Sequence, residues 1–277
     1  MLKDLRFADY FLFTQHSLET FEKCPLKFKK RYLEGLRWES ILDESIKERL
    51  EIGNSFHLLA YRYFLGIEPG LEPGVKAYDK LSKWLNTLQT HFKKEDNALY
   101  LPEYKLRTAK GNLRLEANFD LLIVREGSIE IWDWKTQGES TGDAGINERL
   151  RERRLRESLQ SKVYLFVLRE QLKRVIQKGN ENPQIKMCYW QPEPAKTITE
   201  IEYSQELHEN FTELLESRIN TILEYDYNRF DKEMYKKSCR SCEFNWFCNN
   251  TKVDYKSVEG DIDFLDGLCW DDIDEII

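Results

Sequence analysis

Two aspartates and a lysine near the middle of the chain have residue types and a spacing suited to metal-assisted chemistry. Asp133 and Lys135 are two residues apart in IEIWDWKT, whose alternation predicts a β-strand, so both side chains point to one face. Asp120 lies in the preceding predicted strand, EANFDLLIV, across a short hairpin. Neighbouring carboxylates repel each other unless a cation lies between them, and such oxygen ligands suit Mg²⁺ or Mn²⁺. Alone, the Asp-x-Lys triplet is more typical of a surface pair on a half-exposed strand.

Three further polar residues lie in apolar stretches that predict helices. His57 is the lone histidine of EIGNSFHLLAYRYF, and by itself it is more typical of a hydrogen-bonded core histidine than of a ligand. Gln160 and Tyr164, in LQSKVYLFVL, are four residues apart and therefore share one helix face. Tyr164 alone would fit a packing role equally well.

Cysteines form a second candidate site. Three of them cluster near the end of the chain with C-x2-C-x5-C spacing: Cys239, Cys242 and Cys248. A zinc or iron–sulfur site needs a fourth ligand, for which Cys24 is the remote candidate. Cys188 lies in a predicted strand and is expected to pack as a small apolar residue, and Cys269 receives no role. Buried free thiols are the alternative, and spacing alone does not separate zinc from iron–sulfur.

The elements that must position these residues follow from hydrophobic periodicity. Helical spacing predicts three helices in the first third of the chain, over residues 17–33 (interrupted by Pro25), 40–64 and 75–92. Alternation then predicts strands that begin at Glu103, Asn112 and Ser128, joined by glycine-containing hairpin turns. A long basic helix over 147–177, strands from 184 and 197, and a helix over 204–228 complete the pattern. This order predicts one α/β domain with helical additions.

Composition limits the class of protein. With 277 residues, 41% of them hydrophobic, the chain can bury a sizeable core. No apolar run is long enough to span a membrane, and the first residues lack the layout of a secretory signal, so a cytoplasmic location is expected. In that compartment six cysteines are free thiols or ligands rather than disulfides.

Charge is unevenly distributed along the chain. From Asp254 to the end nine acidic residues and one lysine give a net charge of −8, so the rest carries +1 against the overall −7. Within that near-neutral part, five arginines are close together: Arg149, Arg151, Arg153, Arg154 and Arg156. Charge alone favours a solvated helix face over a nucleic-acid contact. The acidic tail is expected to be a disordered end; occlusion of a basic groove and docking of a partner are the alternatives.

Taken together, the motifs resemble those of the RecB-like branch of the PD-(D/E)XK nuclease superfamily. TQHSLETFEKCPLKFKKRYLEGL resembles its opening segment, and GNSFH, NFD, DWKT and Q-x-x-x-Y follow in the family order. These motifs contain His57, Asp120, Asp133, Lys135, Gln160 and Tyr164. One departure is Asn118, which stands where the family usually has glycine.

The resemblance implies a fold and its boundaries. We expect an α/β restriction-endonuclease-like core (helix, three-strand meander, helix, strand) with added N- and C-terminal helices. Residues 1–253 would form the nuclease domain and 254–277 the acidic C-terminal tail. The cysteine pattern resembles that of the iron–sulfur members, such as AddB-type subunits and CRISPR-associated RecB-like exonucleases. It implies that a [4Fe–4S] cluster, held by Cys24, Cys239, Cys242 and Cys248, staples the chain ends together; zinc is the alternative.

The resemblance also implies an activity, namely metal-dependent hydrolysis of DNA phosphodiesters, most of all at single-stranded ends, in repair, recombination or defence. His57, Asp120, Asp133 and the carbonyl of Trp134 would hold Mg²⁺ or Mn²⁺, with Glu103 a candidate outer ligand. Lys135 would position or deprotonate the attacking water. Gln160 and Tyr164 would hold the strand, and the arginines would contact its phosphates. A helicase or another protein is a possible partner. The rival interpretation is a catalytically inactive nucleic-acid-binding subunit or scaffold that keeps the fold.

Overall fold

A computed structural model describes residues 4–36, 44–136, 144–176, 182–193, 198–240 and 242–253. They divide into two compact units. The first unit contains the described parts of 1–48, 109–115 and 214–277, and the second contains 49–108 and 116–213. The predicted single domain over 1–253 stays a prediction. The acidic tail, with Cys269, lies outside the described residues.

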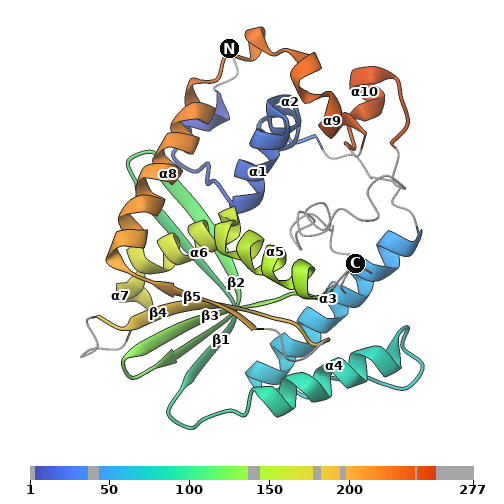
Figure 1. Cartoon of the computed structure of the whole chain (residues 1–277), viewed down its shortest axis with the longest axis vertical. Helices are drawn as coiled ribbons and strands as arrows, with labels where there is room; N and C mark the ends of the chain where they lie inside the picture. Colours follow the sequence, from blue (N-terminus) through green and yellow to red (C-terminus); the bar gives the residue numbers. More distant parts are fainter. Residues whose placement is uncertain are drawn as a thin grey trace. The chain divides into compact units, whose positions relative to one another are not determined.

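A five-stranded sheet organises the second unit (Figure 1). Its strands lie side by side in chain order: β1 (Leu99–Lys110), β2 (Leu113–Arg125), β3 (Ser128–Trp134), β4 (Gln184–Trp190) and β5 (Ile198–Tyr203). β2 and β3 are antiparallel across a turn in which Gly127 has a φ of 85°, a value that favours glycine. β3 and β4 are parallel, and β4 and β5 are antiparallel. The predicted α/β fold is confirmed, and the first three strands are neighbours in chain order.

Helices α3 (Glu44–Leu65) and α4 (Tyr78–His91) pack on the sheet through one aromatic-rich core. Phe56 and Phe64 of α3 stack on Trp190 and Trp134, with ring centroids 6.2 and 6.1 Å apart. Trp84 of α4 meets Phe56 edge-on at 5.6 Å. These large apolar side chains hold α3 firmly against the ends of β3 and β4.

The basic helix predicted over 147–177 is wrong as a single element. The structure has α5 (Ala144–Glu157), α6 (Leu159–Glu170) and α7 (Leu172–Val175) instead. Ser158 causes the first break, because its backbone is extended and its hydroxyl accepts the Ser161 N–H at 3.1 Å as the N-cap of α6. Gln160 and Tyr164 still share one helix, but the arginines belong to another.

The first unit brings the two ends of the chain together. It contains α1 (Gln15–Lys23), α2 (Pro25–Phe28), which continues as a π-helical turn over Lys29–Leu33, and the C-terminal half of α8 (Gln205–Glu224). Beyond α8 come 3₁₀ turns and the short helices α9 (Lys236–Cys239) and α10 (Asn245–Asn249). Arg6 donates to the carbonyls of Ile222 and Tyr225 at 2.6 and 2.9 Å. No helix in the described part of the chain is long and apolar enough to cross a membrane.

Candidate active site

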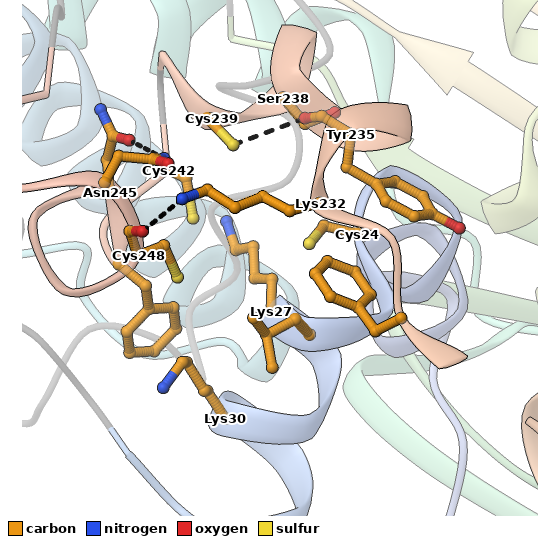
Figure 2. A pocket seen from close by; sticks show the side chains of 14 residues that line it. Cys24, Lys27, Lys30, Lys232, Tyr235, Ser238, Cys239, Cys242, Asn245 and Cys248 are labelled. Carbon is orange, nitrogen blue, oxygen red and sulfur yellow. Dashed lines mark hydrogen bonds between the residues drawn. The ribbon is translucent and has the colours of Figure 1, made fainter. Parts of the chain in front are cut away.

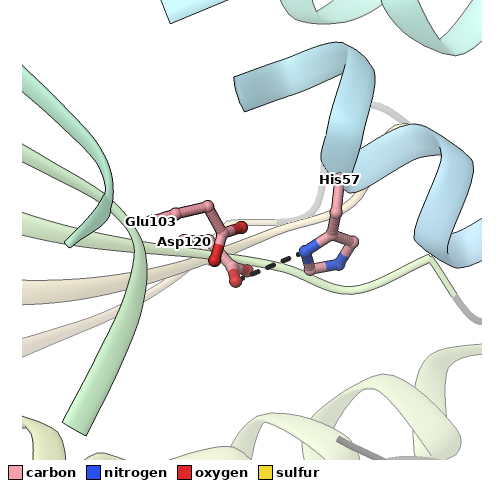
Figure 3. Close-up of side chains that lie close together, drawn as sticks. All are labelled: His57, Glu103 and Asp120. Carbon is pink, nitrogen blue, oxygen red and sulfur yellow. Dashed lines mark ion pairs between the residues drawn. The ribbon is translucent and has the colours of Figure 1, made fainter. Parts of the chain in front are cut away.

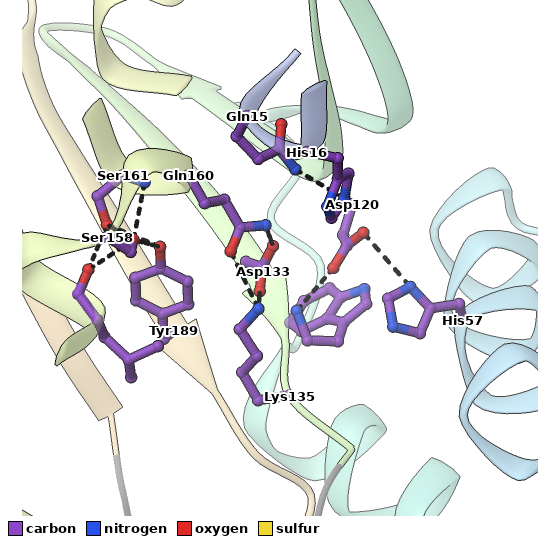
Figure 4. A network of polar contacts seen from close by, with 12 residues as sticks. Gln15, His16, His57, Asp120, Asp133, Lys135, Ser158, Gln160, Ser161 and Tyr189 are labelled. Atoms are coloured by element: carbon purple, nitrogen blue, oxygen red, sulfur yellow. Dashed lines mark hydrogen bonds and ion pairs between the residues drawn. The ribbon is translucent and has the colours of Figure 1, made fainter. Parts of the chain in front are cut away.

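Asp133, Lys135 and Gln160 form a closed set of polar contacts (Figure 4). The Lys135 ammonium lies 2.9 Å from Asp133 Oδ1 and donates to Gln160 Oε1 at 3.0 Å. Gln160 Nε2 in turn donates to Asp133 Oδ2 at 2.6 Å. Each side chain therefore fixes the other two, and Asp133 and Lys135 lie on one side, as their two-residue spacing predicts.

Tyr189 supports this set from the neighbouring strand. It stands beside Asp133 in the parallel β3–β4 register, and its buried ring lies 5.3 Å from the Lys135 ammonium, a cation–π distance. Its hydroxyl is 2.7 Å from the Ser161 hydroxyl and 3.3 Å from that of Ser158. Tyr189 thus connects β4 to the first turn of α6, which carries Gln160.

His57 and Asp120 form a second group next to the first. His57 Nδ1 lies 3.3 Å from Asp120 Oδ1, and Asp120 Oδ2 accepts the backbone N–H of Trp134 at 2.7 Å. Trp134 directly follows Asp133, so the two aspartates reach the same end of β3. The structure also explains the glycine of the GNSFH motif, because a Cβ on Gly53 would lie 2.9 Å from Thr136 Oγ1. Gly53 allows α3 to approach the end of β3 one turn before His57.

Glu103 completes the second group (Figure 3). One ligand atom each from His57, Glu103 and Asp120 lies within 4.8 Å of the other two, an arrangement that could hold a metal ion. Oxygen and imidazole donors suit Mg²⁺, Mn²⁺ and other divalent ions. Sequence reasoning gave Glu103 only an outer role, although Pro102 before it was a signal that the strand pairing is interrupted there.

Burial and mutual repulsion make these acids hard to ionise without a cation. Burial, with the nearby charge of Asp120, raises the pKa of Glu103 to about 7. Burial raises the pKa of Asp133 to about 6 despite the opposing charge of Lys135. Burial alone would lower the pKa of His57, but the negative charge of Asp120 raises it overall. The site therefore has an excess of negative charge that a divalent cation would neutralise.

Two predicted residues are placed differently from the rest. Tyr164 is buried and meets Phe119 edge-on at 5.1 Å, and its role in holding the DNA strand stays a prediction. Trp134 contacts the site through its N–H, and the ligand role of its carbonyl stays a prediction.

The predicted thiols line one pocket in the first unit (Figure 2). Its sulfurs come from Cys24, Cys239, Cys242 and Cys248. Cys24 precedes Pro25 at the start of α2, where backbone N–H groups favour its thiolate although burial raises its pKa overall. Burial raises the pKa of Cys242 to about 12. Lys27 and Lys232 also line the pocket, where Lys27 pairs with Glu243 at 2.7 Å and Lys232 donates to the Cys248 carbonyl at 2.6 Å.

The arginines lie mainly on the surface of α5. Arg149, Arg153, Arg154 and Arg156 are exposed. Two of them pair within the helix, Arg153 with Glu157 at 2.9 Å and Arg156 with Glu152 at 2.8 Å. Arg151 contacts the amide oxygen of Gln191, just after β4. The helix ends at Ser158, which lies beside Tyr189.

Comparison with known families is consistent with this geometry. A sequence model described as the PD-(D/E)XK nuclease superfamily matches residues 12–249. The chain belongs to this superfamily. Among solved structures, this nuclease resembles an Eubacterium rectale protein provisionally described as an exonuclease, with 13% identity, a TM-score of 0.43 and coverage of 76% of this chain and 80% of that one. It also resembles SSO0001, with 16% identity, a TM-score of 0.29 and coverage of 86% and 98%. Among curated proteins no match is found.

Proposed function

We propose that this PD-(D/E)XK nuclease is a Mg²⁺- or Mn²⁺-dependent deoxyribonuclease of the RecB-like branch that degrades single-stranded DNA ends. One observation carries the proposal: Asp120, Asp133 and Lys135 meet at the end of β3 together with His57 and Gln160. A scaffold without catalysis would have no need to bury this many ionisable groups together.

The metal site would use His57, Asp120 and Asp133. The donor set fits, because it combines the His57 imidazole and the Asp120 carboxylate, which lie 3.3 Å apart, with Asp133, whose carboxyl pKa is raised by burial. When bound, the metal supplies Lewis acidity and neutralises charge on the phosphate. The protein's own part is positioning: Lys135, fixed by Asp133 and Gln160, orients the attacking water and places positive charge beside the phosphate.

We also propose that the four thiols hold a [4Fe–4S] cluster rather than zinc. A single tetrahedral zinc with Zn–S bonds of about 2.3 Å needs sulfurs about 3.8 Å apart. Within the described residues, no three sulfurs lie within 4.8 Å of one another, although all four line one pocket. Four thiols around one pocket are the ligand number that a [4Fe–4S] cluster takes. By joining α2 to the segment after α8 it would staple the chain ends.

Substrate DNA would run along α5. The exposed arginines supply phosphate contacts, and the C-terminal end of α5 is tied to the first turn of α6, since Ser161 Oγ donates to the Leu155 carbonyl at 2.6 Å. This turn carries Gln160, so a bound strand would lead towards Lys135.

The decisive experiment follows end-labelled single-stranded and double-stranded DNA with Mg²⁺, Mn²⁺ or EDTA. We expect metal-dependent shortening of the single strands, and at least a thousandfold loss of activity in Asp133→Asn with DNA affinity kept. The change removes the negative charge that holds Lys135. Glu130→Asn is a matched control, because Glu130 is on the same strand and pairs with Arg125 and Lys186 instead.

Outcomes separate the interpretations. DNA binding without cleavage by the wild-type protein would favour the inactive binding subunit. Full activity of Asp133→Asn would refute the assignment of the site. Four irons per chain in protein purified without oxygen would support the cluster, and stoichiometric zinc would exclude it.

A further inference from the structure

Glu103 has a backbone conformation that its residue type disfavours. Its φ is 48°, in the left-handed region, although it lies inside β1. The other described non-glycine residues with positive φ, Ala77 and Asn250, flank helices. A left-handed backbone conformation of a non-glycine residue inside a strand costs conformational free energy, and it persists only where the surrounding structure enforces it.

The distortion has a clear consequence for the side chain. β1 is an edge strand, and Pro102, which lacks an N–H, precedes the distorted residue. A local distortion of this kind redirects a side chain, as β-bulges next to active sites do. The redirected carboxylate lies with His57 and Asp120 (Figure 3).

Asn118 holds the carboxylate in that place. Its side-chain N–H donates to Glu103 Oε2 at 3.2 Å, and it lies two residues before Asp120 on β2. Asn118 is also the residue that stands where the family usually has glycine. If position 103 served only to accept the hydrogen bond from Asn118, a glutamine there would do so equally well. A glutamate instead adds another acid beside Asp120, which is unfavourable unless a cation binds there.

We propose that Glu103 is a protein ligand of the active-site cation, delivered by the distortion of β1 and oriented by Asn118. This deepens the proposed function, on which it rests. The cation would lie between His57, Glu103 and Asp120, while Asp133 also fixes Lys135 and Gln160. Asn118 is then a positioning residue.

Binding of Mn²⁺ tests this directly, without an activity readout. Full-length protein, purified without oxygen and freed of divalent ions at the carboxylates, is titrated with Mn²⁺ by calorimetry. We expect Glu103→Gln to bind at least tenfold more weakly than wild type. Its metal-free melting temperature should rise by a few degrees, because one of the repelling acids is gone. Asn118→Ala, which keeps every ligand, should weaken binding by roughly threefold.

A matched control is Glu116→Gln, on the same strand as Asn118. Its carboxylate lies 3.7 Å from Lys105 and is bonded by Arg107 at 2.5 Å, so Mn²⁺ affinity should stay at the wild-type value and the melting temperature should not rise. Wild-type Mn²⁺ affinity in Glu103→Gln, or a lower metal-free melting temperature, would overturn the proposal and show a structural role. Wild-type protein that binds Mn²⁺ through Glu103 but cuts no DNA would leave this inference standing and refute the proposed function.

Discussion

The nuclease contains two groups of metal-type ligands, and they are built in opposite ways. The carboxylate site is mounted on long elements, the strands β1 to β3 and the 22-residue helix α3. The thiol pocket is lined by α2, α9 and α10, which have only four or five residues each, and by turns. Isolated helices of that length have little stability of their own.

This difference indicates what each group needs from its metal. The carboxylate site is positioned by packing and by hydrogen bonds among its own members, such as Gln160 to Asp133, so its scaffold should fold without a cation. In contrast, the thiol-bearing segments are short and are joined through side-chain contacts, such as Lys27 to Glu243 at 2.7 Å and Lys232 to the Cys248 carbonyl at 2.6 Å. A metal held by the thiols would add to these contacts and contribute directly to the folding of the segments. One metal should therefore serve chemistry and the other stability.

Removing one thiol should give the largest effect on stability. Cys242→Ser should abolish stoichiometric metal in the pocket and lower the melting temperature by roughly 5–10 °C, because the proposed staple between the chain ends would be lost. Cleavage at low temperature should fall much less than in Asp133→Asn. Metal analysis measures the metal content, and calorimetry measures the melting temperature. Cys188→Ser is the control, since Cys188 is buried in β4 away from the pocket and should keep the metal. An unchanged melting temperature in metal-free Cys242→Ser would contradict a structural role for the pocket.

The carboxylate site should instead make stability depend on pH. The folded-state pKa of Glu103 is raised from 4.5 to about 7 and that of Asp133 from 3.8 to about 6. The unfolded chain therefore loses these protons first, and folding stability falls as pH rises from about 4 to 7. The pKa of His57 is raised as well, so its stabilising contribution is lost as pH rises through that value. All three groups act in the same direction.

Thermal melts in EDTA should therefore show a melting temperature lower by roughly 3–5 °C at pH 8 than at pH 5.5. Addition of Mg²⁺ should stabilise the protein more at pH 8, where the acids are ionised. Glu103→Gln should reduce the dependence of the melting temperature on pH, which would assign that dependence to the carboxylate site. Equal Mg²⁺ stabilisation at both pH values would show that the ionised acids do not bind the cation.

The same contrast explains what the sequence could predict. Asp133 lies near the end of β3 and Lys135 follows directly after the strand. The period-two alternation of the strand continues to Lys135, so the common side of the two residues was predictable. The thiol trio was predictable because metal-ligand spacing is local. The break at Ser158 was missed because its N-cap competes with a strong helical pattern on both sides. Glu103 was undervalued because a positive φ in a strand depends on tertiary contacts, here with Asn118, that no periodicity encodes.

Gly53 offers the smallest and most local test of the rigid site. A Cβ at this position would lie 2.9 Å from Thr136 Oγ1, so Gly53→Ala should displace α3 by a few tenths of an ångström from the end of β3. His57 lies one turn further along α3 and should move away from Asp120, now 3.3 Å distant. We expect Mn²⁺ affinity to fall about threefold to tenfold. The melting temperature should stay within about 2 °C of wild type, because the higher helix propensity of alanine offsets part of the cost of the close contact.

Thr136→Ala is the matched background in which to repeat Gly53→Ala, because it removes the oxygen that the new methyl group would contact. In that background Gly53→Ala should leave Mn²⁺ affinity nearly unchanged, and the cycle of single and double variants isolates the contact. Gly53 and Thr136 do not line the thiol pocket, so the metal content of that pocket should be the same in all four proteins. Equal losses with and without the Thr136 hydroxyl would mean that the glycine acts through helix flexibility rather than through the placement of His57.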